Sequence, residues 1–215
     1  MRSAAVLLLL SSAGRGFAQE PLETKLVIQQ GGREIGREVF TLRGGRARGA
    51  PGTTLTAAAY YPLKNPELKL TAGLERTAEY ALAKFQLEVE GPAGTTVILA
   101  AGSGARLIIR TVAKGSEAGR ELPGGPDVVL LDDQVFSLYY QVIDLATQSG
   151  KALTAIFPRT NRRGSFTARK EAGEGGSTRV TLNGNIRGTL LTGPDGGLVR
   201  VELPESGTIV TRAKD

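Results

Sequence analysis

The sequence predicts a mainly β protein with an antiparallel sheet and one short helix. Short segments alternate apolar and polar residues and end at Gly, Pro or Asn, which is the pattern of strands with one wet face. The 215 residues include 29 Gly and 10 Pro, enough to supply many turns. Only the stretch 133–147 combines helical spacing of apolar residues with the absence of Gly and Pro.

The first 18 residues have the features of a secretory signal peptide. Arg2 precedes the apolar run Ala4–Leu10, and small residues lead to Ala18. The run is too short to span a membrane, and a buried N-terminal helix is disfavoured because the segment has no polar face. No Cys is present to carry a lipid anchor. We therefore expect residues 1–18 to be removed, leaving residues 19–215 as a single β-rich domain in the periplasm or outside the cell.

The first predicted strands form a hairpin. Residues Leu22–Gln30 alternate, and Gly31-Gly32 turns the chain into a second strand over Glu34–Arg43. The side chains expected on the buried face of the first strand are those of Leu22, Thr24, Leu26 and Ile28.

Further strands follow from the same period of two. The clearest is Lys84–Glu90, and the others are Arg106–Val112, Lys151–Phe157, Thr178–Asn183, Arg187–Thr192 and Leu198–Leu203. In two of these strands the alternation assigns an inward face, consisting of Phe85, Leu87, Val89, Val199, Val201 and Leu203.

The predicted helix covers Asp133–Thr147. Its apolar face would consist of Val135, Tyr139, Val142, Ile143 and Ala146. Phe136 and Tyr140 are expected at the edge of that face, and Asp132 or Asp133 is expected to cap the N-terminus. Because Val, Tyr and Ile also favour strands, an extended conformation of this stretch remains an alternative.

The residue types restrict the possible chemistry. With no His and no Cys, a Ser-His-Asp triad, a Cys-His dyad and an ordinary zinc site are excluded. Tyr80 and Lys84 have the spacing of a dehydrogenase pair, but no glycine-rich nucleotide loop precedes them. Four serines, Ser103, Ser137, Ser165 and Ser206, lie in no nucleophile motif. We expect no enzyme and no cofactor.

Acidic residues cluster before and within the predicted helix. Asp127, Asp132, Asp133 and Asp144 could be proposed as calcium ligands or paired carboxylates, but no calcium-loop spacing is present. A helix cap explains the adjacent aspartates more simply.

Two basic clusters occur in expected loops, and the formal net charge is +6. Arg43, Arg46 and Arg48 form the first, and Arg159, Arg162, Arg163, Arg169 and Lys170 form the second. Arg159, Arg162 and Arg163 are candidate anion contacts, since a guanidinium binds carboxylate or phosphate bidentately. A solvated loop is the alternative. No aromatic residue adjoins Asn161–Arg163 for base stacking, so nucleic acid is not expected as a partner.

The segment Val129–Tyr140 resembles part of a group of uncharacterised secreted bacterial all-β proteins. The opening hairpin, with Gly31, Ile35, Gly36 and Phe40, and the ending Leu203–Thr208 are similar too. The resemblance implies a single strongly curved antiparallel sheet, a half-barrel or barrel-like form similar to that of outer-membrane lipoprotein carriers. The helix would then pack on its concave face. The resemblance implies no catalytic residues.

Two functions agree with these features. The first is an exported, periplasmic carrier of a lipid-like or other hydrophobic molecule, bound by Phe136, Tyr139, Tyr140 and Ile143 near the helix. The second is a non-catalytic structural or interaction protein of the cell envelope that acts through its surface. A dry, enclosed apolar volume of roughly a few hundred Å³ would favour the carrier, and a filled core would favour the second function. A hydrophobic ligand or an envelope component is the expected partner, without a transmembrane anchor.

Overall fold

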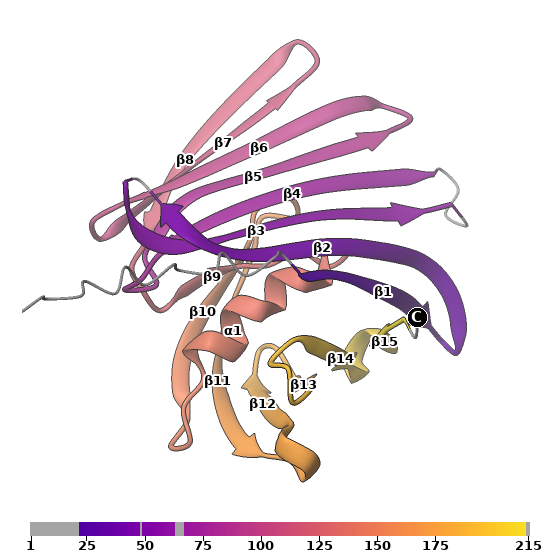
Figure 1. Ribbon diagram of the computed structural model, residues 1–215. Coiled ribbons are helices and arrows are strands. Elements are labelled where there is room, and N and C mark those ends of the chain that lie inside the picture. Colours follow the sequence, from indigo (N-terminus) through magenta and orange to yellow (C-terminus); the bar gives the residue numbers. More distant parts are fainter. Residues whose placement is uncertain (1–21, 48, 63–66, 214–215) are drawn as a thin grey trace, which may run out of the picture.

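The computed structural model describes residues 22–47, 49–62 and 67–213, and the predicted signal peptide lies outside these residues. Fifteen strands form one sheet (Figure 1). They are β1 Leu22–Gln30, β2 Arg33–Ala47, β3 Ala50–Tyr61, β4 Leu68–Thr77, β5 Leu82–Gly91, β6 Gly94–Ser103, β7 Arg106–Ala113, β8 Ser116–Pro123, β9 Val128–Leu130, β10 Lys151–Phe157, β11 Arg162–Ala172, β12 Thr178–Gly184, β13 Gly188–Thr192, β14 Leu198–Leu203 and β15 Thr208–Arg212.

The strand order confirms a mainly β fold with one strongly curved sheet. From β1 in the middle, successive antiparallel hairpins run to β8 at one edge. The chain then crosses to β9 at the other edge and returns through β10–β15, where β15 pairs with β1. The one parallel pair in the described sheet is β9 with β10. The sheet curls around one short helical segment (Figure 1), and two further 3₁₀ turns, η2 Glu174–Gly176 and η3 Pro204–Ser206, connect strands.

The first hairpin is formed as predicted. Gly31 and Gly32 have φ values of 58° and 80°, the left-handed conformation that a two-residue turn between twisted strands needs. Thr24, Leu26 and Ile28 are buried, so this part of the predicted face of β1 points into the core, and the side chain of Leu22 lies outside the described part of the chain.

Several strands do not show an alternation of apolar and polar residues in the sequence. In β3 the buried Ala57 and Ala59 alternate with the exposed Thr56 and Ala58, so side-chain polarity hardly changes along the strand. Small residues on both faces weaken the period-two signal in β3, and the sequence pattern did not predict β4, β6, β8, β9, β11 and β15 either.

The inward face predicted for β14 is wrong in part. Thr192 pairs with Leu198 but Leu191 pairs with Arg200, so Val199 is an extra residue in a β-bulge. As a result Leu198 and Val201 are both buried, while Val199 is half-buried. In β5 the prediction is confirmed for Phe85 and Leu87, and Val89 is half-buried.

The helical segment is shorter than predicted. A 3₁₀ turn, η1 Phe136–Tyr139, continues into α1 Tyr140–Leu145, and Ala146 is already extended. The predicted apolar face is confirmed, since all of its members are buried: Val135, Tyr139, Val142, Ile143 and Ala146. Phe136 is also only 1% exposed, so the edge position predicted for it is wrong. The segment contacts β2 and β11, on opposite halves of the sheet.

Arginines connect distant parts of the curved sheet. Arg120 of β8 donates to Pro158 O at 2.9 Å and to Asn161 Oδ1, both in the β10–β11 turn. Arg76, at the end of β4, is 3% exposed and donates to Pro126 O at 3.1 Å and to Gln141 Oε1 at 2.9 Å. These contacts hold the edge strands against the body of the sheet.

Candidate functional site

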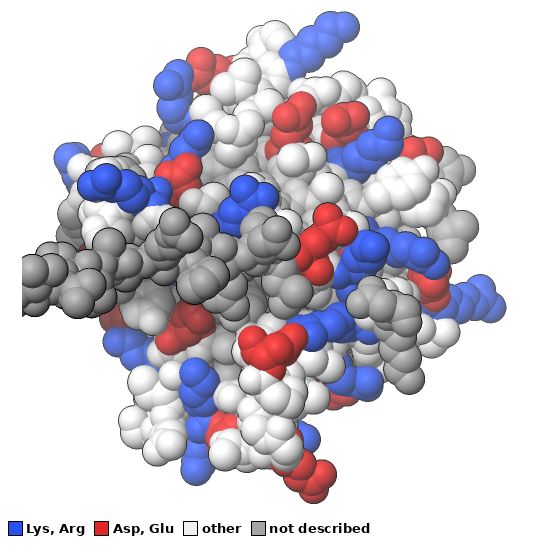
Figure 2. Space-filling model, viewed as in Figure 1, with Lys and Arg blue, Asp and Glu red and all other residues white. Residues whose placement is uncertain are grey.

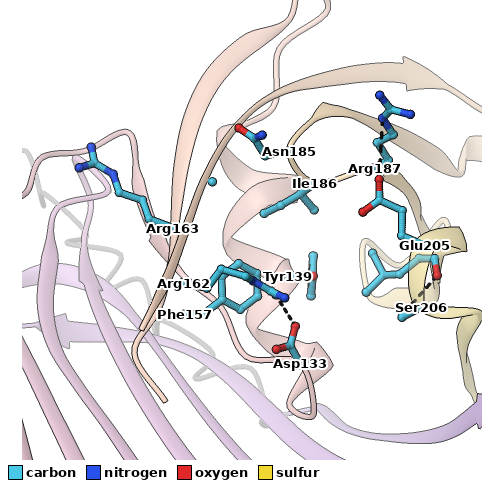
Figure 3. Close-up of a pocket in the computed structure, with 12 residues that line it drawn as sticks. Asp133, Tyr139, Phe157, Arg162, Arg163, Asn185, Ile186, Arg187, Glu205 and Ser206 are labelled. Atoms are coloured by element: carbon cyan, nitrogen blue, oxygen red, sulfur yellow. Dashed lines mark hydrogen bonds and ion pairs between the residues drawn. The ribbon is translucent and has the colours of Figure 1, made fainter. Parts of the chain in front are cut away.

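A pocket with a volume of about 510 Å³ opens beside the start of the helical segment (Figure 3). Tyr139 of η1 forms one wall, and the β10–β11 hairpin forms a second. The β12–β13 turn and the end of β14 complete it. The lining therefore comes from four segments that are distant in sequence, brought together by the inward curl of β10–β14.

The apolar part of this pocket consists of Tyr139, Phe157, Ile186 and Leu203. Tyr139, Phe157 and Ile186 belong to the hydrophobic core, and Leu203 packs against it. Gly164 of β11 has no side chain, and a Cβ there would lie 3.1 Å from the Asn185 Cβ. A larger residue at position 164 would intrude on the pocket wall, so glycine keeps this wall open.

Two ion pairs line the same pocket. Arg162 Nη2 lies 2.6 Å from Asp133 Oδ1, and its guanidinium lies 4.0 Å from the centre of the Phe157 ring. Arg187 Nε lies 3.9 Å from Glu205 Oε1, beyond hydrogen-bond distance. The two pairs lie apart in the pocket, with Tyr139 between them (Figure 3).

A buried polar cluster fixes the chain at the edge of the pocket. Arg159 binds Asp132 bidentately, with Nε–Oδ2 and Nη2–Oδ1 distances of 2.8 and 2.9 Å. Asp132 is 1% exposed, and its Oδ1 also accepts from the Gln134 N–H at 2.8 Å. Arg159 is thus committed to an internal carboxylate, an arrangement that positions Asp133 beside Arg162.

Glu38 of β2 supplies the cap predicted for Asp132 or Asp133. Its Oε2 accepts from the Phe136 N–H at 2.7 Å and its Oε1 from the Ser137 N–H at 3.0 Å. No side chain caps η1 from its N-cap residue, Val135, so the prediction of a local aspartate cap is wrong. Burial raises the pKa of Glu38 to about 7, although the two N–H donors oppose that shift.

The predicted site residues separate into different environments. Of the four ligand candidates, Tyr139 lines the pocket, whereas Phe136 and Ile143 face the core. The Tyr140 hydroxyl donates to Gly196 O at 2.8 Å, tying the helix to the β13–β14 turn. Of the three candidate anion contacts, Arg162 faces the pocket. The Arg163 side chain points away from it (Figure 3), and Arg159 binds Asp132.

Sequence reasoning missed the other half of the pocket. Asn185, Ile186 and Arg187 form the β12–β13 turn, and Glu205 and Ser206 follow β14. No spacing or motif in these segments points to a site. Their proximity to Asp133 and Arg162 arises from the inward curl of β10–β14.

The groups considered for catalysis or metal binding do not converge. Tyr80 lies in the β4–β5 turn with φ 62°, and Lys84 lies on the exposed side of β5. Asp127 pairs with Lys151 at 2.7 Å. Within the described ranges no three acidic side chains gather as cation ligands, and no helix is long and apolar enough to cross a membrane.

Comparison with known proteins supports the fold. No family model matches the chain, and no curated protein matches its sequence. A beta-barrel-like protein of the domain of unknown function DUF1849 from Brucella abortus matches with a TM-score of 0.55 and 9% identity, over 90% of this chain and 96% of that one. A DUF1089 family protein from Pseudomonas aeruginosa matches with a TM-score of 0.48 and 14% identity, over 79% of this chain and 90% of that one. The first similarity confirms a barrel-like, mainly β fold.

Proposed function

We propose that the protein is an exported, non-catalytic binding protein or carrier for a lipid-like or other hydrophobic molecule. The observation that supports this most is the pocket of about 510 Å³ beside Tyr139. Its volume lies in the range of small-molecule sites, and such sites combine an apolar lining with a few placed polar groups. Tyr139, Phe157, Ile186 and Leu203 provide the apolar lining, and the polar groups belong to Asp133, Arg162, Asn185, Arg187, Glu205 and Ser206.

The proposed position of the ligand differs from the one expected from sequence. The interface between the helical segment and the sheet is filled by side chains, including Phe136, Val142 and Ile143. A ligand would therefore lie beside the first turn of the helix, in the open pocket, rather than beneath the helix. Tyr139 is the predicted ligand residue that could contact it there.

A structural protein of the envelope remains the second candidate, and the filled helix–sheet interface is the observation in its favour. Such a protein would act through its surface and would need no ligand. Native mass spectrometry of protein purified from its own host separates the two functions. The carrier function predicts a co-purifying hydrophobic molecule, and the structural function predicts the bare mass of the chain.

A pocket-filling variant tests the binding site directly. Ser206 lines the pocket and is exposed, so Ser206→Trp should occupy part of the volume. The uncharged fluorescent probe N-phenylnaphthylamine is expected to bind the parent and to bind this variant weakly. The matched control is Ser116→Trp at the exposed start of β8, a residue that does not line the pocket. Equal probe binding by both variants, or none by the parent, would contradict the proposal.

Export is tested separately by sequencing the N-terminus of the protein recovered from its host. We expect the mature chain to begin near Gln19, after the small residues that end the apolar leader. A cytoplasmic protein that retains Met1 would contradict the exported location without bearing on the pocket.

A further inference from the structure

We propose that the pocket selects an amphiphile with a zwitterionic headgroup, one that carries both an anionic and a cationic group. This inference rests on the proposed function and adds the class of ligand. It starts from the charged side chains that face the pocket, which are Arg162, Asp133, Arg187 and Glu205. Arg163 adds only its backbone, since its side chain points away (Figure 3). The facing charges therefore balance.

Basic and acidic side chains are also mixed on the face of the molecule that Figure 2 shows. The formal net charge of +6 favours anions over the whole molecule, but no patch of one sign on this face would guide a ligand. Recognition must then come from individual groups inside the pocket.

The two ion pairs differ in how firmly they are held. Arg162 is bound by Asp133 at 2.6 Å and stacked on Phe157. Arg187 and Glu205 are 3.9 Å apart, and their side chains are 66% and 62% exposed. This wider pair is not hydrogen-bonded, so a headgroup can insert between its members at small cost.

A headgroup with one charge would satisfy only half of this wider pair. An anion that binds Arg187 would stand close to the Glu205 carboxylate, and a cation that binds Glu205 would stand close to Arg187. Like charges at that distance repel. A zwitterion avoids this conflict, because its anionic group takes Arg187 while its cationic group takes Glu205. The acyl or alkyl chain would then lie on Leu203, Ile186 and Tyr139.

The test compares amphiphiles that share one dodecyl chain and differ in headgroup. Dodecylphosphocholine, dodecyl phosphate and dodecyltrimethylammonium compete with N-phenylnaphthylamine at neutral pH, each below its micelle concentration. We expect dodecylphosphocholine to bind about fivefold more tightly than either compound whose headgroup carries charge of one sign only, the effect of one exposed ion pair.

Variants of the loose pair provide the second readout. Glu205→Gln removes the repulsion of an anion, so its preference should shift about fivefold towards dodecyl phosphate. Arg187→Gln should shift it by a similar factor towards dodecyltrimethylammonium. Arg163→Gln removes one positive charge, as Arg187→Gln does, but from a side chain that points away from the pocket. It should leave the headgroup preference unchanged.

The outcomes separate this inference from the proposed function. Three results would overturn the zwitterionic headgroup and leave the carrier function intact. They are equal affinity for all three amphiphiles, tighter binding of dodecyl phosphate, and an unchanged preference in Glu205→Gln. Failure of every amphiphile and of the uncharged probe to bind the parent would overturn both. Melting temperatures close to that of the parent will show that the variants are folded.

Discussion

Glu38 carries a conflict between burial and hydrogen bonding. Its carboxylate is 1% exposed, a position that favours the neutral acid, yet it accepts two backbone N–H bonds at the start of η1, which favour the charged form. Burial dominates, and the pKa rises to about 7 from its ordinary value of 4.5. The same residue holds the turn that carries Tyr139 into the pocket.

Glu38 should make stability depend on pH. Between pH 4.5 and 7 the folded protein holds a proton that the unfolded chain has released, so the free energy of unfolding falls as the pH rises through this window. Glu38→Gln cannot titrate. The difference in unfolding free energy between parent and variant, measured by urea denaturation at several pH values, should decline across the window. Parallel curves would show that Glu38 keeps an ordinary pKa.

At the scale of the element, the helical segment is stabilised by packing rather than by its own sequence. It has ten residues in η1 and α1 together, too few to be stable alone. No side chain within it caps it, and its apolar face lies in the core.

Ile143→Ala should therefore destabilise the protein strongly. Ile143 is 5% exposed, and removing its side-chain atoms leaves a cavity against the sheet, at a cost of about 2–5 kcal/mol. Thermal or urea unfolding measures this loss. The exposed Ser149→Ala, beyond the helix, should change stability by no more than ~0.5 kcal/mol. Equal stability of both variants would contradict the packing of α1.

The bulge in β14 gives a second prediction at this scale. Val201 is fully buried and Val199 is half-buried, although they are two residues apart on one strand. Val201→Asp would bury an unpaired charge and should cost several kcal/mol, whereas Val199→Asp can reach solvent and should cost less. Equal decreases in melting temperature would indicate that Val199 and Val201 share one buried face, and would contradict the bulge.

At the scale of the whole molecule, Arg76 connects parts that the sheet alone does not join. Its guanidinium donates to the Tyr80 carbonyl in the β4–β5 turn at 2.7 Å, to Pro126 O and Val128 O near β9, and to the Gln141 side chain of α1. Burial lowers its pKa to about 10, so it remains charged at neutral pH.

Arg76→Met should loosen the edge of the sheet. The substitution leaves several buried acceptors without a donor, and each unsatisfied acceptor lowers the free energy of unfolding by about 1–3 kcal/mol. We therefore expect faster amide hydrogen exchange in β9 and α1. Arg110→Met is the control, since Arg110 is exposed on β7 and pairs with Glu117. Unchanged exchange in β9 would show that the edge is held by strand pairing alone.

Local sequence determined the parts of the fold in which polarity changes along the chain. The strand at Lys84–Glu90 follows from strict alternation, and the buried face of the helical segment follows from the helical spacing of Val135, Tyr139 and Val142. Both patterns depend only on neighbouring residues, because the period of a strand or helix is set by its own backbone.

Tertiary structure decided what depends on pairing between distant segments. Glu38 caps a turn that lies 98 residues further along the chain, and no local pattern marks it as a cap. The bulge at Val199 depends on how β14 pairs with β13. The pocket joins Asp133, Arg162, Arg187 and Glu205 because the sheet curls back on itself. The physical reason is that such contacts are set by strand order and curvature, which a sequence pattern of period two or 3.6 does not encode.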